Sequence, residues 1–243
     1  MTLTFRNALP MVAETAHGTV LFADLRGYMG LAEQLAPARI VPLLQEFFAI
    51  LSSTTELHGG QIFHMAGDGM MAGFGFRDPS QDGAHEALAA SRMMLQRFTP
   101  VATRWWSALS IETGLGVGLH FGEVALGFFG PPGRQAMTLV GDTVNVAARL
   151  CGRARIGEVL FSASVAAMLG EVLGRVSVAD PDAGTTLFLQ LPQFELRGRS
   201  ERLDIWCAPA TERIELRDSS PRQAVDACTD SPPTSLSGAF SNE

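Results

Sequence analysis

The sequence predicts an α+β fold of the ferredoxin-like, or split βαβ, type, in which helices pack on a central, antiparallel-rich sheet. Three observations lead to this prediction. Short apolar runs of strand type alternate with two segments of helical periodicity, their order along the chain is β-α-β-β-α-β, and tight glycine-containing connections join neighbouring strands. With 243 residues, 47% of them apolar, the chain is long enough to bury a sizeable core.

The predicted order begins with a strand and a long helix. Residues 19–23 are a compact apolar run of buried-strand type, and this run ends at Asp24. Between residues 31 and 57, apolar side chains recur at spacings of three and four, which is typical of one helix face. Gly59 and Gly60 follow, so we expect one long helix that ends before them.

A hairpin, a second helix and another hairpin complete the core order. The apolar runs 61–65 and 70–74 are joined by a glycine-flanked connection, which places Asp68 at the tip of a hairpin. Residues 82–98 have helical periodicity. Its predicted buried residues are Ala84, Leu88, Ala89, Met93, Met94 and Phe98. We then expect strands over 115–121 and 124–129, paired as a hairpin through Gly122 and Glu123.

The rest of the chain adds a further unit and a tail. The remaining predicted elements are helices over 143–150 and 163–169, the second with Ser162 as N-cap, and strands over 158–161, 193–196 and 203–207. Beyond about residue 210 the composition shifts to Ser, Pro, Thr, Asp and Arg, which is typical of disorder. The predicted organisation is a short lead-in over 1–16, one domain over 17–209 and a disordered tail over 210–243.

Composition excludes several classes of protein. The net charge of −7 provides no basic face for a phosphate backbone, so nucleic acid is not an expected partner. Three widely spaced cysteines predict neither a disulfide framework nor a cysteine-bound zinc. The apolar stretch 117–130 is interrupted by His120 and Glu123, and the N-terminus does not match a signal peptide. We therefore predict no membrane span and a cytoplasmic location.

Asp24 and Asp68 are the first candidates for chemistry. An aspartate at a strand end more often accepts turn hydrogen bonds than binds a ligand. Here, however, each acid ends or links a predicted central strand, and adjacent strands would bring the two carboxylates within a few ångströms. Such a pair repels unless a cation lies between the carboxylates, and Mg²⁺ accepts one or two carboxylates together with substrate phosphates. The backbone N–H groups of the turn through Gly27 and Tyr28 are candidates for holding a polyphosphate.

Asn145 and Arg149 form a second candidate pair. They lie four residues apart in a predicted helix that is otherwise small and apolar, so they share one face and could reach one ligand. The alternative, a solvated face without function, usually carries more charge than this segment does.

Four blocks of the sequence together resemble the catalytic domain of class III adenylyl and guanylyl cyclases. The blocks are residues 20–28, 66–68, 118–124 and 141–150, and they occur in order with family-like spacing between about residues 14 and 209. The resemblance implies a homodimer with two interfacial active sites, in which one subunit supplies the metal-binding aspartates and the other contacts base and ribose. Two Mg²⁺ or Mn²⁺ ions per site are implied as cofactors.

The resemblance also assigns roles to individual residues. Asp24 and Asp68 match the metal positions, Asn145 the ribose-orienting residue and Arg149 the residue that stabilises the transition state. Arg197 lies where the family usually has a lysine for the terminal phosphates, and this chain contains no lysine; Arg199 is the weaker candidate.

The nucleotide-base pocket departs from the family pattern. Four residues before Asp68 the family's adenylyl cyclases usually place a lysine, and this chain has His64. Thr138 matches its usual partner and favours ATP over GTP; it also resembles the threonine-bearing subgroup, some members of which respond to bicarbonate. His64 is able to serve either base, because a neutral imidazole both donates and accepts. His120, on an apolar strand, is expected to be a packed core residue.

The predicted function is conversion of ATP to 3′,5′-cyclic AMP and pyrophosphate. The alternatives are a guanylate cyclase that makes cyclic GMP and a catalytically weak, regulatory cyclase-homology domain. A diguanylate cyclase would need a Gly-Gly-acid-acid-Phe hairpin, which residues 66–70 do not provide. A metal-dependent phosphohydrolase would need a cluster of His and Asp ligands, which the sequence does not show.

Overall fold

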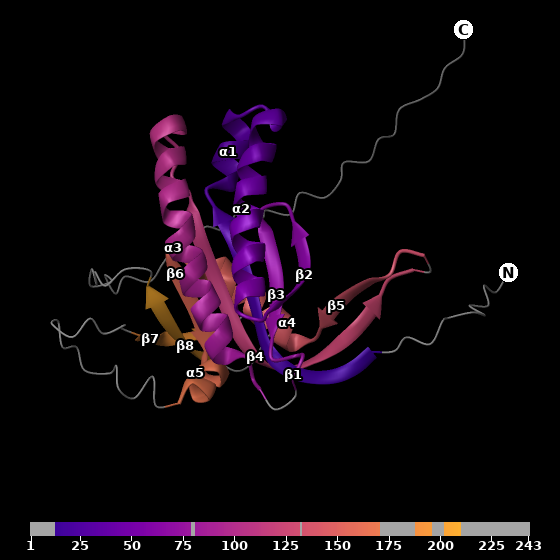
Figure 1. The fold of residues 1–243 in the computed structure, drawn as a ribbon. Coiled ribbons are helices and arrows are strands. Elements are labelled where there is room, and N and C mark those ends of the chain that lie inside the picture. The colour runs from indigo at the N-terminus through magenta and orange to yellow at the C-terminus, as the bar shows by residue number, and fades with distance from the viewer. Residues whose placement is uncertain (1–12, 79–80, 132, 171–187, 196–201, 210–243) are drawn as a thin grey trace, which may run out of the picture. The chain divides into compact units, whose positions relative to one another are not determined.

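The protein is described by a computed structural model over residues 13–78, 81–131, 133–170, 188–195 and 202–209 (Figure 1). The elements are β1 (Ala13–Arg26), α1 (Tyr28–Gln34), α2 (Pro37–Leu57), β2 (Gln61–Ala66), β3 (Gly69–Phe74), α3 (Ala84–Leu109), β4 (Gly114–Phe129), β5 (Ala136–Val140), α4 (Asp142–Arg153), β6 (Glu158–Ser162), α5 (Ala163–Leu169), β7 (Leu189–Glu195) and β8 (Arg202–Pro209).

The strands form one eight-stranded sheet. Its order is β2-β3-β1-β4-β6-β8-β7, and β5 pairs with β4 beside this path. The pairs among β2, β3, β1 and β4 are antiparallel, whereas β6 runs parallel to β4. The first four strands thus have the connectivity and order of a split βαβ fold, which confirms the predicted fold class.

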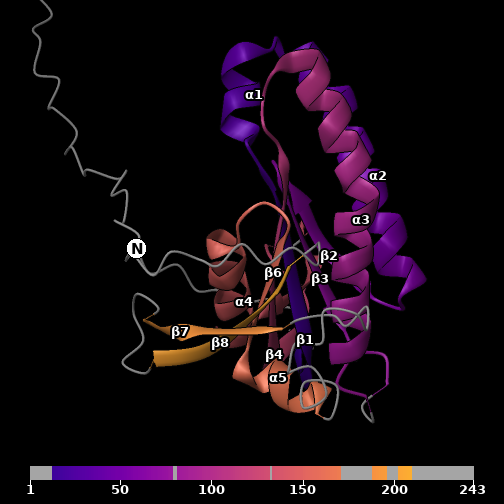
Figure 2. The ribbon, with the colours of Figure 1, turned by 90° about the vertical axis from the view of Figure 1, so that its left-hand side faces the viewer.

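The helices cover both faces of the sheet. Helices α1, α2 and α3 lie on one face and α4 lies on the other, as Figure 2 shows. The main core, on the first face, contains Phe47 of α2, Phe98 of α3 and Val165 of α5, all with 1% or less of their surface exposed. Smaller clusters beneath α4 include Val146 and Leu150. Apolar side chains therefore pack against both faces of the sheet.

The predicted hairpin through Gly122 and Glu123 is wrong. Strand β4 runs without interruption through both residues, which pair with Gly18 and His17 of β1. Gly122 does not adopt a positive φ, and the fourteen residues of β1 all have partners on β4. The actual hairpin joins β4 to β5, a strand that the sequence analysis did not predict.

The helix boundaries also differ from the prediction. The single helix expected over residues 31–57 is two helices, because Leu35 and Ala36 are extended and Pro37 begins α2, a position that suits proline. Helix α3 continues past Pro100 to Leu109, since Val101 and Trp105 are still buried in the main core.

Individual side chains of α3 and α5 differ in part from the prediction. On α3, Ala89 is exposed and Met93 only half-buried, although both were expected inside. Ser162 does occupy the N-cap of α5 but makes no side-chain capping bond. The tail predicted over 210–243 lies outside the described residues, and the predicted domain boundaries stay predictions. Among the helices of the described ranges, none has the length and hydropathy needed to span a bilayer.

Candidate active site

The two candidate metal aspartates meet at the junction of β1 with the β2–β3 hairpin. Asp24 pairs with Gly69, and the backbone N–H of the next residue, Leu25, donates to the carbonyl oxygen of Asp68 at 2.8 Å. Both aspartates line one cavity of about 320 Å³. Its lining residues are Phe22, Ala23, Asp24, His64, Ala66, Asp68, Gly69, Met70, Met71, Ala148, Cys151 and Gly152. The expected meeting of the two acids on adjacent strands is therefore seen in the fold.

The electrostatics of the cavity agree with this placement. Burial raises the pKa of Asp24 above its ordinary value; the nearby Arg26 guanidinium opposes this increase, and the negative charge of Asp68 adds to it. Asp24 and Asp68 are thus close enough to repel each other. Such a carboxylate pair gains most from a cation placed between its members.

Arg26 is a site residue that the sequence analysis missed. Its Nη1 forms an ion pair with Oδ2 of Asp24, its Nε donates to the carbonyl oxygen of Ala154 at 3.0 Å, and its Nη2 donates to the carbonyl oxygen of Cys151. Asp24 and Arg26 are two residues apart on a strand, so their side chains leave the same face. This alternation was the signal available in the sequence.

Cys151, on α4, contributes a neutral thiol to the cavity wall. Only 4% of its surface is exposed, and its Sγ donates to the carbonyl oxygen of Gly116 at 3.3 Å. Burial raises the pKa of the thiol to about 12. Because a metal ligand or nucleophile must be the thiolate, Cys151 has a packing role here.

The turn after Asp24 is sterically fixed. Gly27 has a φ of 82°, and a Cβ there would lie 3.2 Å from the carbonyl carbon of Glu112 and closer still to its oxygen. Any other residue would be strained at this position. Tyr28 begins α1 and packs partly buried against the main core. The predicted contact of this turn with phosphate stays a prediction.

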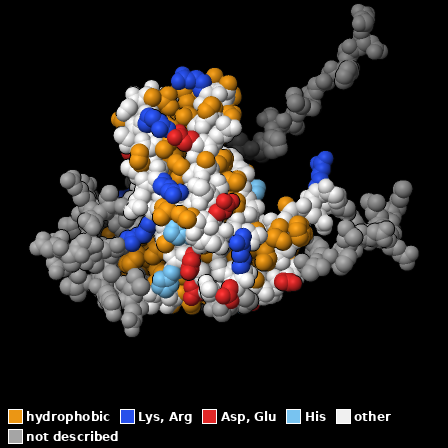
Figure 3. Space-filling view, in the orientation of Figure 1, with side chains coloured by type: hydrophobic (Ala, Val, Ile, Leu, Met, Phe, Trp, Pro, Cys, Tyr) orange, Lys and Arg blue, Asp and Glu red, His pale blue; other side chains and the backbone are white. Residues whose placement is uncertain are grey.

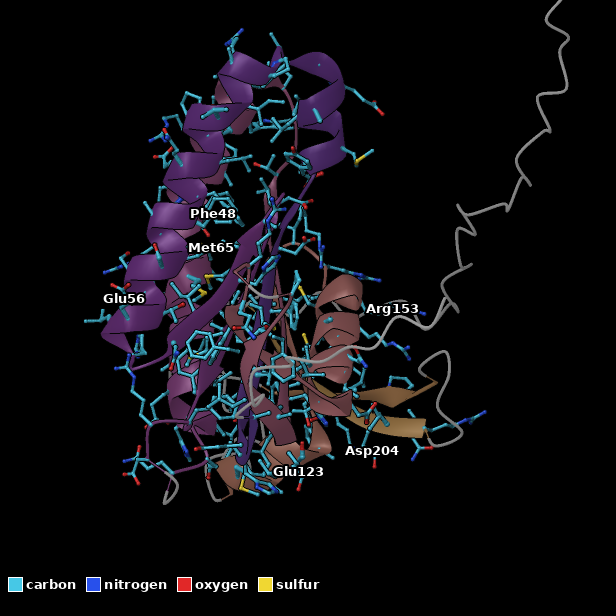
Figure 4. All side chains as sticks on the ribbon, turned by 90° about the vertical axis from the view of Figure 1, so that its right-hand side faces the viewer. Phe48, Glu56, Met65, Glu123, Arg153 and Asp204 are labelled. Carbon is cyan, nitrogen blue, oxygen red and sulfur yellow. The ribbon has the colours of Figure 1, made fainter. Side chains whose placement is uncertain are left out.

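Asn145 and Arg149 do not line the aspartate cavity of their own chain. Both are exposed on α4, on the same side of the helix, as their spacing predicted. Ala148, Cys151 and Gly152 of α4 line the aspartate cavity, whereas Asn145 and Arg149 are not among its lining residues. Helix α4 therefore borders the cavity of the chain's own carboxylates, and its Asn145 and Arg149 lie outside the lining of that cavity. Figure 4 shows this helix on the opposite side of the sheet from α2, with Arg153 at its end.

The two predicted base-contacting residues lie on different hairpins. His64 is exposed on β2 and lines the aspartate cavity, whereas Thr138 is half-buried on β5 and does not. The strands do approach each other, since Gln61 Nε2 lies 3.4 Å from Met137 Sδ. Arg197, the predicted phosphate-binding residue, and Arg199 lie outside the described residues.

His120 has partners that account for it structurally. It is half-buried on β4, and its Nδ1 lies 2.6 Å from the hydroxyl oxygen of Ser162 and 3.3 Å from that of Ser164. The histidine is not part of the aspartate cavity. This bond also explains why the Ser162 hydroxyl does not cap α5.

The fold and the paired acids together define a nucleotidyl cyclase domain of class III. The chain belongs to the family described as "Adenylate and Guanylate cyclase catalytic domain", whose model matches residues 12–194. An adenylate cyclase of Anabaena cylindrica is 32% identical over 141 residues, which is 58% of this chain and 28% of that protein. An uncharacterized protein of Mycobacterium tuberculosis (strain ATCC 25618 / H37Rv) is 34% identical over 142 residues, 58% of this chain and 25% of that protein. The matched segment thus spans about a quarter of these curated relatives.

Solved structures show the same fold. The guanylyl cyclase Cya2 superposes with a TM-score of 0.68 at 26% identity, covering 81% of this chain and 93% of that one. The adenylyl cyclase CyaB from P. aeruginosa gives a TM-score of 0.70, also at 26% identity, covering 83% and 97%. One is a guanylyl and the other an adenylyl cyclase, so the structural similarity supports membership of the family but does not distinguish ATP from GTP as the substrate.

Proposed function

We propose that the protein converts ATP to 3′,5′-cyclic AMP and pyrophosphate, using two Mg²⁺ or Mn²⁺ ions at the interface of a homodimer. The observation that carries this proposal is the meeting of Asp24 and Asp68 at one cavity, where the negative charge of Asp68 helps to raise the pKa of Asp24. A family member with one aspartate near the end of β1 and another in the turn before the neighbouring β3 has the groups needed to hold divalent ions beside a triphosphate.

The donor set fits a metal site that substrate completes. In the described ranges, no three His, Cys, Asp or Glu side chains converge as a metal cluster. Two carboxylates suit Mg²⁺ or Mn²⁺, since Mg²⁺ commonly takes one or two carboxylates and fills its other positions with water and substrate phosphates. The bound ions would make the ribose 3′-hydroxyl more acidic and neutralise charge on the phosphates.

The chain's own residues would position the reactants. The ribose 3′-oxygen forms a bond to the α-phosphorus, the bond from that phosphorus to the bridging oxygen breaks, pyrophosphate leaves, and the hydroxyl proton passes to water. Asn145 would orient the ribose and Arg149 would stabilise the charge that develops on the phosphorus oxygens. Arg197 and the turn through Gly27 and Tyr28 would hold the terminal phosphates, and His64 and Thr138 the base.

Two observations support the homodimer: Asn145 and Arg149 are not among the residues that line the aspartate cavity, and apolar side chains are exposed on both hairpins. Figure 3 shows hydrophobic atoms gathered over the β4–β5 hairpin, where Phe128, Met137 and Val140 are 53%, 38% and 47% exposed. Met65 of β2 is 44% exposed and is labelled in Figure 4. Surfaces of this kind mark protein interfaces.

Complementation tests the shared site. Asp24→Asn and Arg149→Ala chains should each be inactive alone. A mixture should regain activity, because one of the two interfacial sites in each mixed dimer then has both intact halves. Absence of recovery in mixtures shown to contain mixed dimers would contradict the shared site.

Product analysis tests the reaction and its substrate. Purified protein is incubated with Mn²⁺ and either ATP or GTP, and the cyclic nucleotides are separated by chromatography; Asp68→Asn is the control. Thr138 leads us to expect cyclic AMP as the main product. Cyclic GMP as the main product would favour the guanylate cyclase alternative, which the exposed His64 in place of a lysine supports. If neither nucleotide gives a cyclic product, the result would favour the hypothesis of a regulatory cyclase-homology domain.

A further inference from the structure

The guanidinium of Arg26 forms a hydrogen bond with one of the two oxygens of the Asp24 carboxylate and not with the other. Nη1 holds Oδ2, while Oδ1 faces the β2–β3 hairpin, where it lies 3.5 Å from the position that a Cβ on Gly69 would occupy. Asp68 is the residue before Gly69, so the oxygen left open is the one on the side of the second acid. A planar guanidinium with fixed donors is suited to setting the orientation of a carboxylate.

The same guanidinium binds the end of helix α4. Nε donates to the carbonyl oxygen of Ala154, and Nη2 donates to that of Cys151, so the cation satisfies two carbonyls at the negative end of the helix dipole. The group lies against Gly116, where a Cβ would come within 2.7 Å of both Nε and Nη2. The side chain is therefore closely packed, with only 21% of its surface exposed.

Helix α4 connects these contacts with the groups of the reaction. It carries the exposed residues Asn145 and Arg149, both within about two and a half turns of the end that Arg26 holds. One side chain thus contacts a metal-binding carboxylate and the backbone of the helix that bears the ribose and transition-state residues.

We propose that Arg26 is a positioning residue that orients Asp24 toward Asp68 and couples the metal half-site to helix α4. The inference rests on the proposed function and extends it to the relation between the two active sites. In the homodimer, the α4 of one subunit serves the other subunit's site, so Arg26 links the metal of one site to the ribose-contacting groups of the next. A cation bound at Oδ1 of Asp24 weakens the attraction between this carboxylate and the guanidinium, and this alters the contacts of Arg26 with the end of α4.

The experiment compares Arg26→Gln, Arg26→Lys and a matched control, Arg92→Gln, with the wild-type chain. Arg92 is also a half-buried arginine, but it lies over the ring of Phe188, 5.5 Å from its centroid, and away from Asp24. Three quantities are measured: Mn²⁺ affinity by electron paramagnetic resonance, hydrogen exchange of the 146–154 peptide with and without Mn²⁺, and kcat and KM. Circular dichroism shows that each variant is folded.

We expect Mn²⁺ to change exchange at the end of α4 by about twofold or more in the wild type and Arg92→Gln, and not in either Arg26 variant. Both Arg26 variants should lose about 10- to 100-fold in kcat with little change in nucleotide KM. Arg26→Gln should bind Mn²⁺ as tightly as the wild type or tighter, because a positive charge has left the site. Arg26→Lys keeps the charge but offers no planar fork, so it separates positioning from simple neutralisation.

Two results would overturn the proposal. One is an exchange response to Mn²⁺ that persists in Arg26→Gln, and the other is loss of this response in Arg92→Gln as well. If the wild type makes no cyclic nucleotide but its exchange response still requires Arg26, the proposed function fails and the link stands. If turnover is present and the response is independent of Arg26, the link alone fails.

Discussion

Substitution of Gly118 by alanine should damage both stability and turnover. Gly118 lies on β4 directly beneath α4. A Cβ there would lie 2.7 Å from the Cα of Cys151, and closer still to the backbone N of Cys151 and the carbonyl oxygen of Ala147. Ordinary contacts begin at 3.4 Å, and all three atoms belong to the helix backbone, so no flexible side chain is able to give way. Helix α4 must therefore retreat from the sheet by about 1 Å.

The cost follows from this displacement. Overpacking typically costs about 1–3 kcal/mol, and the rigid backbone contact places Gly118→Ala at about 3 kcal/mol, the upper end of that range. For a chain of this size the melting temperature should fall by about 6–12 °C. The same shift displaces Asn145 and Arg149, and a misplacement of about 1 Å is enough for a loss of about 100-fold in kcat.

Thermal and urea denaturation measure the first effect, and cyclic nucleotide production well below the melting temperature measures the second. The control for stability is Gly152→Ala on the same helix, where a new Cβ would have no atom within 4 Å. That variant should be as stable as the wild type or more stable, since alanine favours helix over glycine by about 0.5–1 kcal/mol. A Gly118→Ala protein with wild-type melting temperature would refute the steric reasoning.

Three further outcomes are expected. Asp24→Asn should raise the melting temperature near neutral pH in the presence of EDTA. Burial raises the pKa of Asp24 in the folded state, so the protonated carboxyl is favourable for folding at pH below 3.8, the pKa of the unfolded state, and this contribution is lost as the pH rises. The difference in melting temperature between the two proteins should therefore vanish in acid. An Asp24→Asn protein that is less stable than the wild type at pH 7 would contradict this. Arg149→Ala should lower kcat by about 100-fold or more and leave Mn²⁺ affinity unchanged, and full turnover would show the assigned role to be wrong. The Cys151 thiol, whose pKa is raised to about 12, should resist iodoacetamide at pH 8 in the folded protein and react after unfolding, as peptide mass spectrometry would show.

The parts of the fold set by local sequence were predictable. The β2–β3 hairpin follows from two apolar runs around a glycine-flanked Asp68, and its bounds agree with the prediction to within a residue. The failures lie where distant partners decide. Glycine is typical of turns, but Gly122 stays in a strand because it pairs with Gly18 of β1. A proline such as Pro100 usually marks the end of a helix, but α3 continues beyond it because Val101 and Trp105 are buried in the core.

The candidate site divides in the same way. The approach of Asp24 and Asp68 was predictable, because Asp24 lies near the end of β1, Asp68 lies in the turn before β3, and β1 and β3 are neighbours. The contacts of Arg26 with α4 were not, since they join residues about 125 positions apart. Thr138 was placed by resemblance alone, because its strand, β5, was not recognised in the sequence.

The position of Asn145 and Arg149 outside the lining of the aspartate cavity has a quantitative consequence for a cell. If each reaction centre is assembled from two copies, the number of working centres at low abundance grows with the square of the number of chains. Doubling expression would then raise output about fourfold until most copies are paired. Abundance would then act as a steep control on the output.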